Sequence, residues 1–152
     1  MANVIYDLLQ RAERLEKELS SGDMLAKIIM DNEAYIVELN AQQQLYEKGV
    51  NSLNIAISSY SPYSNLTIEI KKEKGQPTNR VTLRDEGDFH ASFYVGTLPD
   101  AFYIYATDDK TEKLEKKYGS AIFGLTPDSR NELAWGIMYG ELLTSIREIL
   151  TQ

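Results

Sequence analysis

Apolar residues recur at helical spacing near both ends of the chain, and this pattern constrains the fold more than any other feature. Between residues 4 and 19 they follow one another at intervals of three and four: Val4, Ile5, Leu8, Leu9, Ala12, Leu15 and Leu19. A second series lies near the other end: Leu133, Ala134, Ile137, Met138, Leu142, Ile146 and Ile149, with Trp135 and Tyr139 on a flanking face. This spacing is typical of amphipathic helices. We therefore predict a helix with one buried stripe at each end.

Local capping signals place the helix boundaries. The phrase Thr126-Pro127-Asp128 supplies a hydroxyl N-cap, a proline at the first helical position and an acid near the positive end of the helix dipole. Residues 20–23 interrupt the first helix, and the apolar spacing then predicts a second helix that runs to about Glu47. Gly49 follows it as a left-handed C-cap. A short charged helix is predicted over residues 111–118.

The middle of the chain carries the strand signals. Residues 93–95 and 102–105 are aromatic and β-branched runs joined by a turn at residues 96–101, which predicts a hairpin. Residues 80–84 alternate as a short strand would. Residues 64–74 fit either a strand or a short helix capped by Ser64, and the charged end of the segment favours the helix.

Together these elements predict an α+β fold with N-terminal helices, a small antiparallel sheet with a central hairpin, and a long C-terminal helix. The length of 152 residues fits a single domain over 1–152. Within it we expect an N-terminal helical part (1–48), a loop and sheet part (50–107) and a second helical part (111–151).

Composition excludes several classes of protein. The chain has no cysteine and one histidine, so disulfides, thiolate metal sites, a cysteine nucleophile and a multi-histidine metal centre are excluded. No apolar run approaches the ~20 residues of a membrane span, and no secretory signal is visible, so we expect synthesis in the cytoplasm and no membrane partner.

The charge pattern argues against nucleic-acid binding. The net charge is −7, whereas a protein that binds the phosphate backbone is normally basic. One exception is the segment of residues 71–84, which contains five basic residues and one acidic residue and so has a local charge of +4. A solvated helix end explains such a run without a ligand. We expect no sequence-specific nucleic-acid partner.

Only one cluster of residues suggests catalysis. Asp85, Glu86, Asp88 and His90 lie within six residues of one another and could hold a divalent metal for hydrolysis. An acidic turn that caps the next segment explains the same residues, and we favour it because side chains at successive turn positions point apart. No glycine-rich phosphate loop is present. We therefore assign no catalytic residue, metal or cofactor, and keep a small metal-dependent hydrolase using Asp85, Asp88 and His90 as an alternative.

The order of several phrases resembles the phage virion-morphogenesis family, which includes tail-completion proteins of tailed bacteriophages. The phrases are Tyr60-Ser61-Pro62-Tyr63-Ser64, then Thr67, Lys71-Lys72 and Gly75, then the stretch from Thr82 to Phe93, then Tyr118-Gly119 and Ile122-Phe123-Gly124-Leu125-Thr126. The resemblance covers roughly residues 45–150. Two positions depart from the family pattern: Glu86 stands where threonine is usual, and Gly124 follows Phe123 directly.

The resemblance implies a virion protein that acts in tail completion or head-tail joining, assembled in the cytoplasm of the host bacterium. It implies a ring of identical subunits that contacts neighbouring tail or connector proteins, and no catalysis. A phage-encoded regulator of a host protein is a further alternative.

Assembly contacts should come from segments outside the monomer core. We expect them at residues 75–79, 96–101 and 119–125. The candidate contact residues are Phe123, Leu125, Tyr118, Lys71 and Lys72. For Phe123 and Leu125 there is an equal alternative, in which they only seat the last helix on the sheet.

Overall fold

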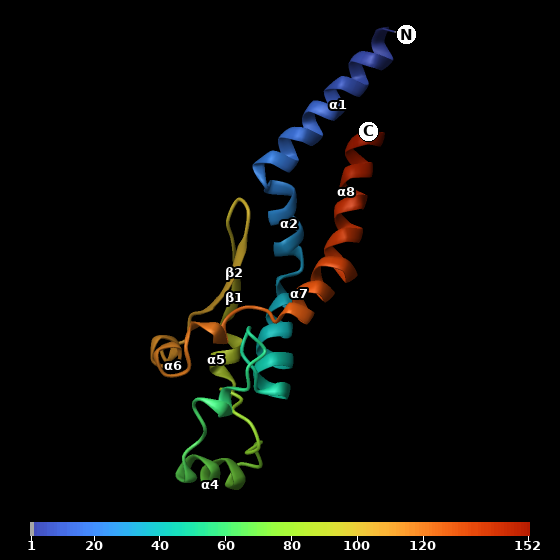
Figure 1. The fold of residues 1–152 in the computed structure, drawn as a ribbon. Coiled ribbons are helices and arrows are strands. Elements are labelled where there is room, and N and C mark those ends of the chain that lie inside the picture. Colours follow the sequence, from blue (N-terminus) through green and yellow to red (C-terminus); the bar gives the residue numbers. More distant parts are fainter. Residues whose placement is uncertain (1) are drawn as a thin grey trace.

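The computed structural model describes residues 2–152 and shows a body from which two helices project (Figure 1). Helix α1 (Ala2–Ser21) and helix α8 (Tyr139–Thr151) lie side by side and run in opposite directions, so the two ends of the chain meet at one end of the molecule. The body holds the remaining helices and a two-stranded antiparallel sheet. The fold is therefore α+β, as the sequence predicts.

The predicted second helix is confirmed in extent but consists of three segments. These are α2 (Asp23–Asp31), α3 (Glu33–Val37) and the π-helix η1 (Glu38–Lys48), followed by the left-handed Gly49 (φ 65°). The break lies at Asn32, whose side-chain amide donates to the Ile28 carbonyl at 2.9 Å and to Glu141 of α8 at 2.9 Å. Asn32 thus fixes both the kink and the position of α8 beside α2.

Gly22 joins α1 to α2 at a point where only glycine fits. Its φ is 77°, and a Cβ atom there would lie 2.2 Å from the Pro99 carbonyl oxygen. A side chain would therefore be strained and would collide with backbone. The close approach seats the hairpin turn against the junction of the two helices.

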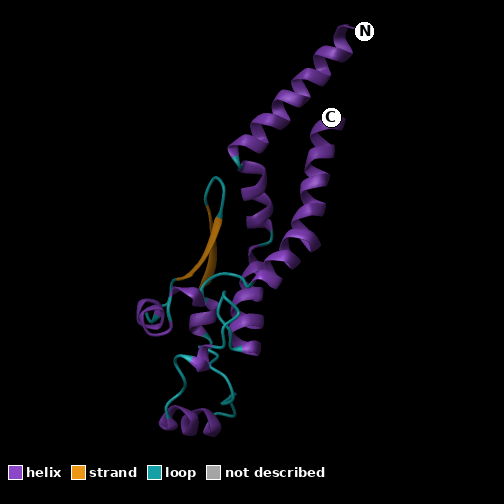
Figure 2. Ribbon diagram, viewed as in Figure 1, coloured by secondary structure: helices purple, strands orange, loops and turns teal. Residues whose placement is uncertain are grey.

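The sheet is the predicted hairpin. Strands β1 (Phe93–Thr97) and β2 (Phe102–Ala106) pair antiparallel, with Phe93 opposite Ala106 and Val95 opposite Ile104 (Figure 2). These four side chains are buried in the main core. Alternation along each strand therefore points one face of the hairpin into the body.

The ambiguity at residues 64–74 resolves in favour of the helix. Helix α4 (Asn65–Glu73) begins at Ser64, whose hydroxyl accepts from the Thr67 amide at 3.2 Å. A 3-10 turn, η2 (Ile57–Ser59), precedes α4, and the short helix α5 (Asp88–Ala91) leads into β1.

The strand predicted at residues 80–84 is wrong. The segment pairs with no strand in residues 2–152. Leu83 adopts a left-handed φ of 52°, which breaks the pleated alternation. The Thr82 amide donates instead to the Tyr63 hydroxyl at 2.9 Å, so a side chain replaces the ladder partner.

The C-terminal part follows the predicted boundaries. Helix α6 (Thr111–Tyr118) ends at Gly119, and the turn η3 (Ser120–Ile122) leads to α7 (Pro127–Leu133). The Thr126 hydroxyl caps α7 by accepting from the Ser129 amide at 3.2 Å. A π-helical stretch, η4 (Ala134–Met138), joins α7 to α8.

Two clusters of buried residues form the core. The main cluster lies in the body, between η1, the hairpin and residues 118–133. The smaller one contains Met24, Ile28 and Ile149 and holds α2 against α8, with Leu15 of α1 packed at its edge.

The buried stripe predicted for α1 is therefore wrong along most of its length, since only Leu15 reaches a core cluster. The C-terminal end of α8 lies opposite Arg11, whose guanidinium donates to the Leu150 carbonyl at 2.9 Å. No described element covers the first turns of α1, which extend beyond that point (Figure 1).

Candidate assembly surface

The predicted contact loop at residues 119–125 is clamped to the body by two side-chain amides of η1. Asn40 donates to the Ile122 carbonyl at 3.0 Å and accepts from the Gly124 amide at 3.0 Å. Gln44 donates to the Gly124 carbonyl at 2.9 Å and accepts from the Thr126 amide at 2.8 Å. Both side chains are completely buried. Each amide satisfies two backbone groups, so the loop is part of the monomer's structure.

The three candidate contact residues near this loop pack inward. Leu125 and Tyr118 are buried in the main core. Phe123 is partly buried, and its ring lies 4.7 Å from that of Tyr105 and 5.5 Å from that of Phe93, measured between centroids. The structure thus supports the alternative in which Phe123 and Leu125 seat the last helix on the sheet. Because Leu125 and Tyr118 are buried, we no longer expect them to be contact residues.

The two candidate lysines differ in exposure. Lys71 is buried, and its amine donates to the Arg84 carbonyl at 2.8 Å and to the Gln76 side chain at 3.0 Å. Lys72 is exposed. Burial therefore argues against Lys71 as a contact residue. Lys72 is exposed and remains a candidate.

Much of the remaining positive charge of residues 71–84 is used within the chain. Lys74 pairs with Asp85 at 2.5 Å, and Arg80 donates to the Tyr46 carbonyl at 2.7 Å. The guanidinium of Arg84 lies 4.7 Å from the centroid of the Tyr46 ring, within cation–π range. The stretch does not present an open basic surface.

The two predicted contact turns are held to differing degrees. At residues 75–79, the Gln76 side chain donates to the Asp85 carbonyl at 2.7 Å. At residues 96–101, the turn is closed by the Leu98 amide donating to the Ala101 carbonyl at 2.7 Å, while the Leu98 side chain is exposed. Pro99 of this turn lies against Gly22. Leu98 is thus an exposed large apolar residue of the second turn.

The structure does not bring Asp85, Asp88 and His90 together as a metal site. No group of three or more His, Asp or Glu side chains in residues 2–152 could hold a metal ion. The hydrogen bond from Lys74 lowers the pKa of the Asp85 carboxyl, which commits it to an ion pair. His90 packs beside the rings of Phe89 and Phe93, and burial together with the positive charge of Arg84 lowers its pKa to about 4. It is a neutral core-edge histidine at pH 7.

The largest unexplained feature is an apolar surface on α1. Four aliphatic side chains of its first turns are more than half exposed: Val4 (61%), Ile5 (64%), Leu8 (54%) and Leu9 (57%). We call these four residues the apolar ridge. Exposed large side chains concentrated in this way mark contact sites, whereas single ones need no explanation.

An apolar groove continues from the ridge toward the other end of α1. It has a volume of about 550 Å³ and is lined mainly by Ala12, Leu15, Leu19 and Leu150, with Glu16 and Ser20. Leu150 comes from α8, so the groove lies where the two projecting helices meet. We call it the apolar groove. By helical periodicity of about 100° per residue, the groove residues of α1 lie on the same side of the helix as Ile5 and Leu8.

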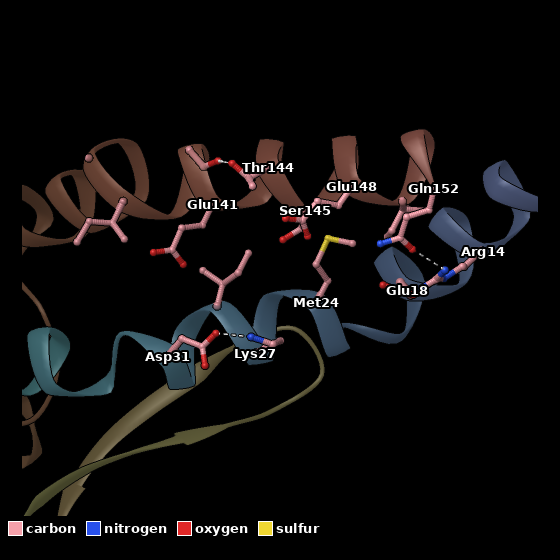
Figure 3. A pocket seen from close by; sticks show the side chains of 15 residues that line it. Arg14, Glu18, Met24, Lys27, Asp31, Glu141, Thr144, Ser145, Glu148 and Gln152 are labelled. Atoms are coloured by element: carbon pink, nitrogen blue, oxygen red, sulfur yellow. Dashed lines mark hydrogen bonds and ion pairs between the residues drawn. The ribbon is translucent and has the colours of Figure 1, made fainter.

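A different side of the helix pair carries charged residues. Figure 3 shows a second groove between α8 and the α1–α2 segment; its volume is about 670 Å³. Arg14 reaches Gln152 across it at 3.4 Å, and Lys27 pairs with Asp31 at 2.5 Å. Its lining is mixed, since it also includes Met24, Ile28 and Ile149 of the smaller core cluster.

An exposed aromatic pair lies where η4 meets α8. The rings of Trp135 (71% exposed) and Tyr139 (51%) are tilted by 50° with their centroids 5.5 Å apart. Tryptophan and tyrosine are enriched among residues that dominate binding at interfaces. The flanking position predicted for them is confirmed.

The apolar spacing of α1 predicted one covered stripe, so the ridge was not predicted as a surface. The sequence nevertheless contains a signal for it. Apolar residues at positions 4, 5, 6, 8 and 9 cover roughly 200° of the helix circumference, more than one core-facing stripe needs. A helix end that is apolar on more than one side calls for more than one packing partner.

Comparisons of the chain with protein-family models, with curated proteins and with solved structures find no match. Among the helices of residues 2–152, none combines the length and apolar character needed to cross a membrane.

Proposed function

We propose that this chain is a structural assembly protein that acts as a homo-oligomer in tail completion or head-tail joining of a tailed phage or prophage. One observation carries the proposal: no element within residues 2–152 covers the apolar ridge and the adjoining groove of α1. Such a surface is stabilised when another protein covers it.

The size of this surface supports a protein partner. At about 30 Å² per apolar carbon, the exposed fractions of the ridge, Leu19 and Leu150 amount to roughly 400 Å² of apolar area. A typical monomer's largest apolar patch is about 300–600 Å² and is often functional. Stable interfaces bury about 800 Å² per partner once polar residues at the rim are included.

The type of assembly comes from the resemblance to virion-morphogenesis proteins. A ring of identical subunits needs contacts between copies, of which the α1 surface can supply one, and contacts to neighbouring tail or connector proteins. The exposed Trp135–Tyr139 pair, Leu98 and Lys72 are available for the latter. The separated positions of Asp85, Asp88 and His90 give the hydrolase alternative no metal site in residues 2–152.

The test is mass spectrometry of purified particles from a lysate that carries this gene, paired with electron microscopy of a deletion mutant. The proposal expects several copies per particle, and free heads with unfinished tails in the mutant. Absence from particles together with normal assembly in the mutant would contradict it and favour a phage-encoded regulator of a host protein.

A further inference from the structure

We infer that the partner of the α1 surface is α1 of a second copy, packed antiparallel so that the ridge of each copy fills the apolar groove of the other. The inference rests on the proposed homo-oligomer and specifies one of its self-contacts. The contact is isologous, since each ridge residue meets the same groove residues in both directions, so it joins copies in pairs, and a ring needs a second, different contact between the pairs.

The positions of ridge and groove on α1 favour this arrangement. The ridge occupies residues 4–9 and the α1 part of the groove occupies residues 12–20, on a shared side of one continuous helix. A two-fold axis near Ala12 exchanges the two halves. It places Ile5 level with Leu19 of the second copy, and Leu9 level with Leu15. The small side chain of Ala12 at the centre lets the two helices approach closely.

The area is sufficient for a stable dimer. Two copies of the α1 surface contribute roughly 800 Å² of apolar area. Interfaces are about 57% apolar, so a contact of roughly 1,400 Å² is implied, which lies within the range of standard interfaces. Continuation of the contact along α8 from Leu150 adds to this area.

The first experiment measures the mass in solution by sedimentation at about 50 µM, a concentration that an interface of this size should saturate. The wild-type chain of 17.3 kDa should sediment as a dimer. Leu8→Glu should weaken the dimer more than about 100-fold, because two leucines leave an apolar contact and two charges enter it.

The matched control is Gln10→Glu, which adds the same charge to a neighbouring turn on the polar side of α1. It should leave the dimer within a few-fold of wild type. Both positions are exposed in the monomer, so helicity and Tm of the monomer should not change. A wild-type chain that is monomeric at 50 µM, or a Leu8→Glu variant that dimerises like wild type, would overturn the inference.

The second experiment tests direction by disulfide trapping, which the absence of native cysteine makes clean. A disulfide needs Cα atoms about 4.4–6.8 Å apart. Ala12→Cys, near the two-fold axis, should link to itself, and Ile5→Cys should link to Leu19→Cys in a mixture. The exposed Lys116→Cys on α6 is the control and should link to neither. Ile5→Cys that links efficiently to itself would show a parallel pair and overturn the inference.

The two proposals can fail separately. A trapped antiparallel dimer of a protein that is absent from particles would sustain this contact and contradict the proposed function. A protein found in particles that stays monomeric in solution and gives no Ala12→Cys link would retain the function and show that a different chain covers α1.

Discussion

Replacement of Gln44 by leucine should lower the free energy of unfolding substantially, because this side chain joins two parts of the chain through two hydrogen bonds. The substitution puts an apolar side chain of similar size at a completely buried position. It leaves the Gly124 carbonyl and the Thr126 amide without their partners. An unsatisfied buried polar group costs about 1–3 kcal/mol. Thr126 is buried and Gly124 is partly accessible to water, so we expect a loss of about 2–4 kcal/mol.

Urea unfolding followed by circular dichroism measures this loss. With a slope of about 2 kcal/mol per molar urea, the midpoint should fall by about 1–2 M, and the Tm by roughly 5–15 °C. The control is Gln43→Leu at the neighbouring, partly exposed position, which should change stability by less than about 0.5 kcal/mol. A Gln44→Leu variant as stable as this control would refute the clamp, and residues 119–125 would return as a candidate contact loop.

Three further predictions follow from the described geometry. His90 has a pKa of about 4 in the folded state against 6.5 in the unfolded state, so the unfolded state binds more protons between these two pH values. The free energy of unfolding should therefore rise by up to about 3 kcal/mol from pH 4 to 6.5. Unfolding measured over this pH range should lack this rise in His90→Phe. Gly22→Ala should lower the Tm by more than about 5 °C in thermal unfolding, because its Cβ collides with the Pro99 carbonyl and its φ is left-handed. Chelator or added Mn²⁺ should shift the Tm by less than about 1 °C; a larger stabilisation by metal would revive the hydrolase alternative.

Sequence reasoning succeeded where the determining signal is local. Ser64 and Thr126 each cap a helix through an amide three residues ahead, and the sequence displays both partners within one turn. The hairpin is similarly local, since its two strands adjoin one short turn. These elements follow from a few neighbouring residues.

It failed where distant residues decide the outcome. Residues 119–125 look like a free loop because the amides that clamp them belong to Asn40 and Gln44, about 80 residues earlier. The alternation at residues 80–84 resembles a strand, but the Tyr63 hydroxyl takes the Thr82 amide and Leu83 turns left-handed.

The apolar period of α1 predicted a covered face and gave no information about what covers it. Periodicity records that a face avoids water, whether it is buried within the monomer or against another chain. The candidate assembly surface could therefore be recognised only once the structure showed Ile5, Leu8 and Leu9 without a partner.

The central claim is that α1 is buried against another copy of this chain inside a phage particle. It is tested most directly by producing particles that carry Ala12→Cys, oxidising them, and measuring the mass of the protein without reduction. We expect a disulfide-linked dimer of twice 17.3 kDa in the purified particles. Particles that contain only the single chain, or none of this protein, would contradict it.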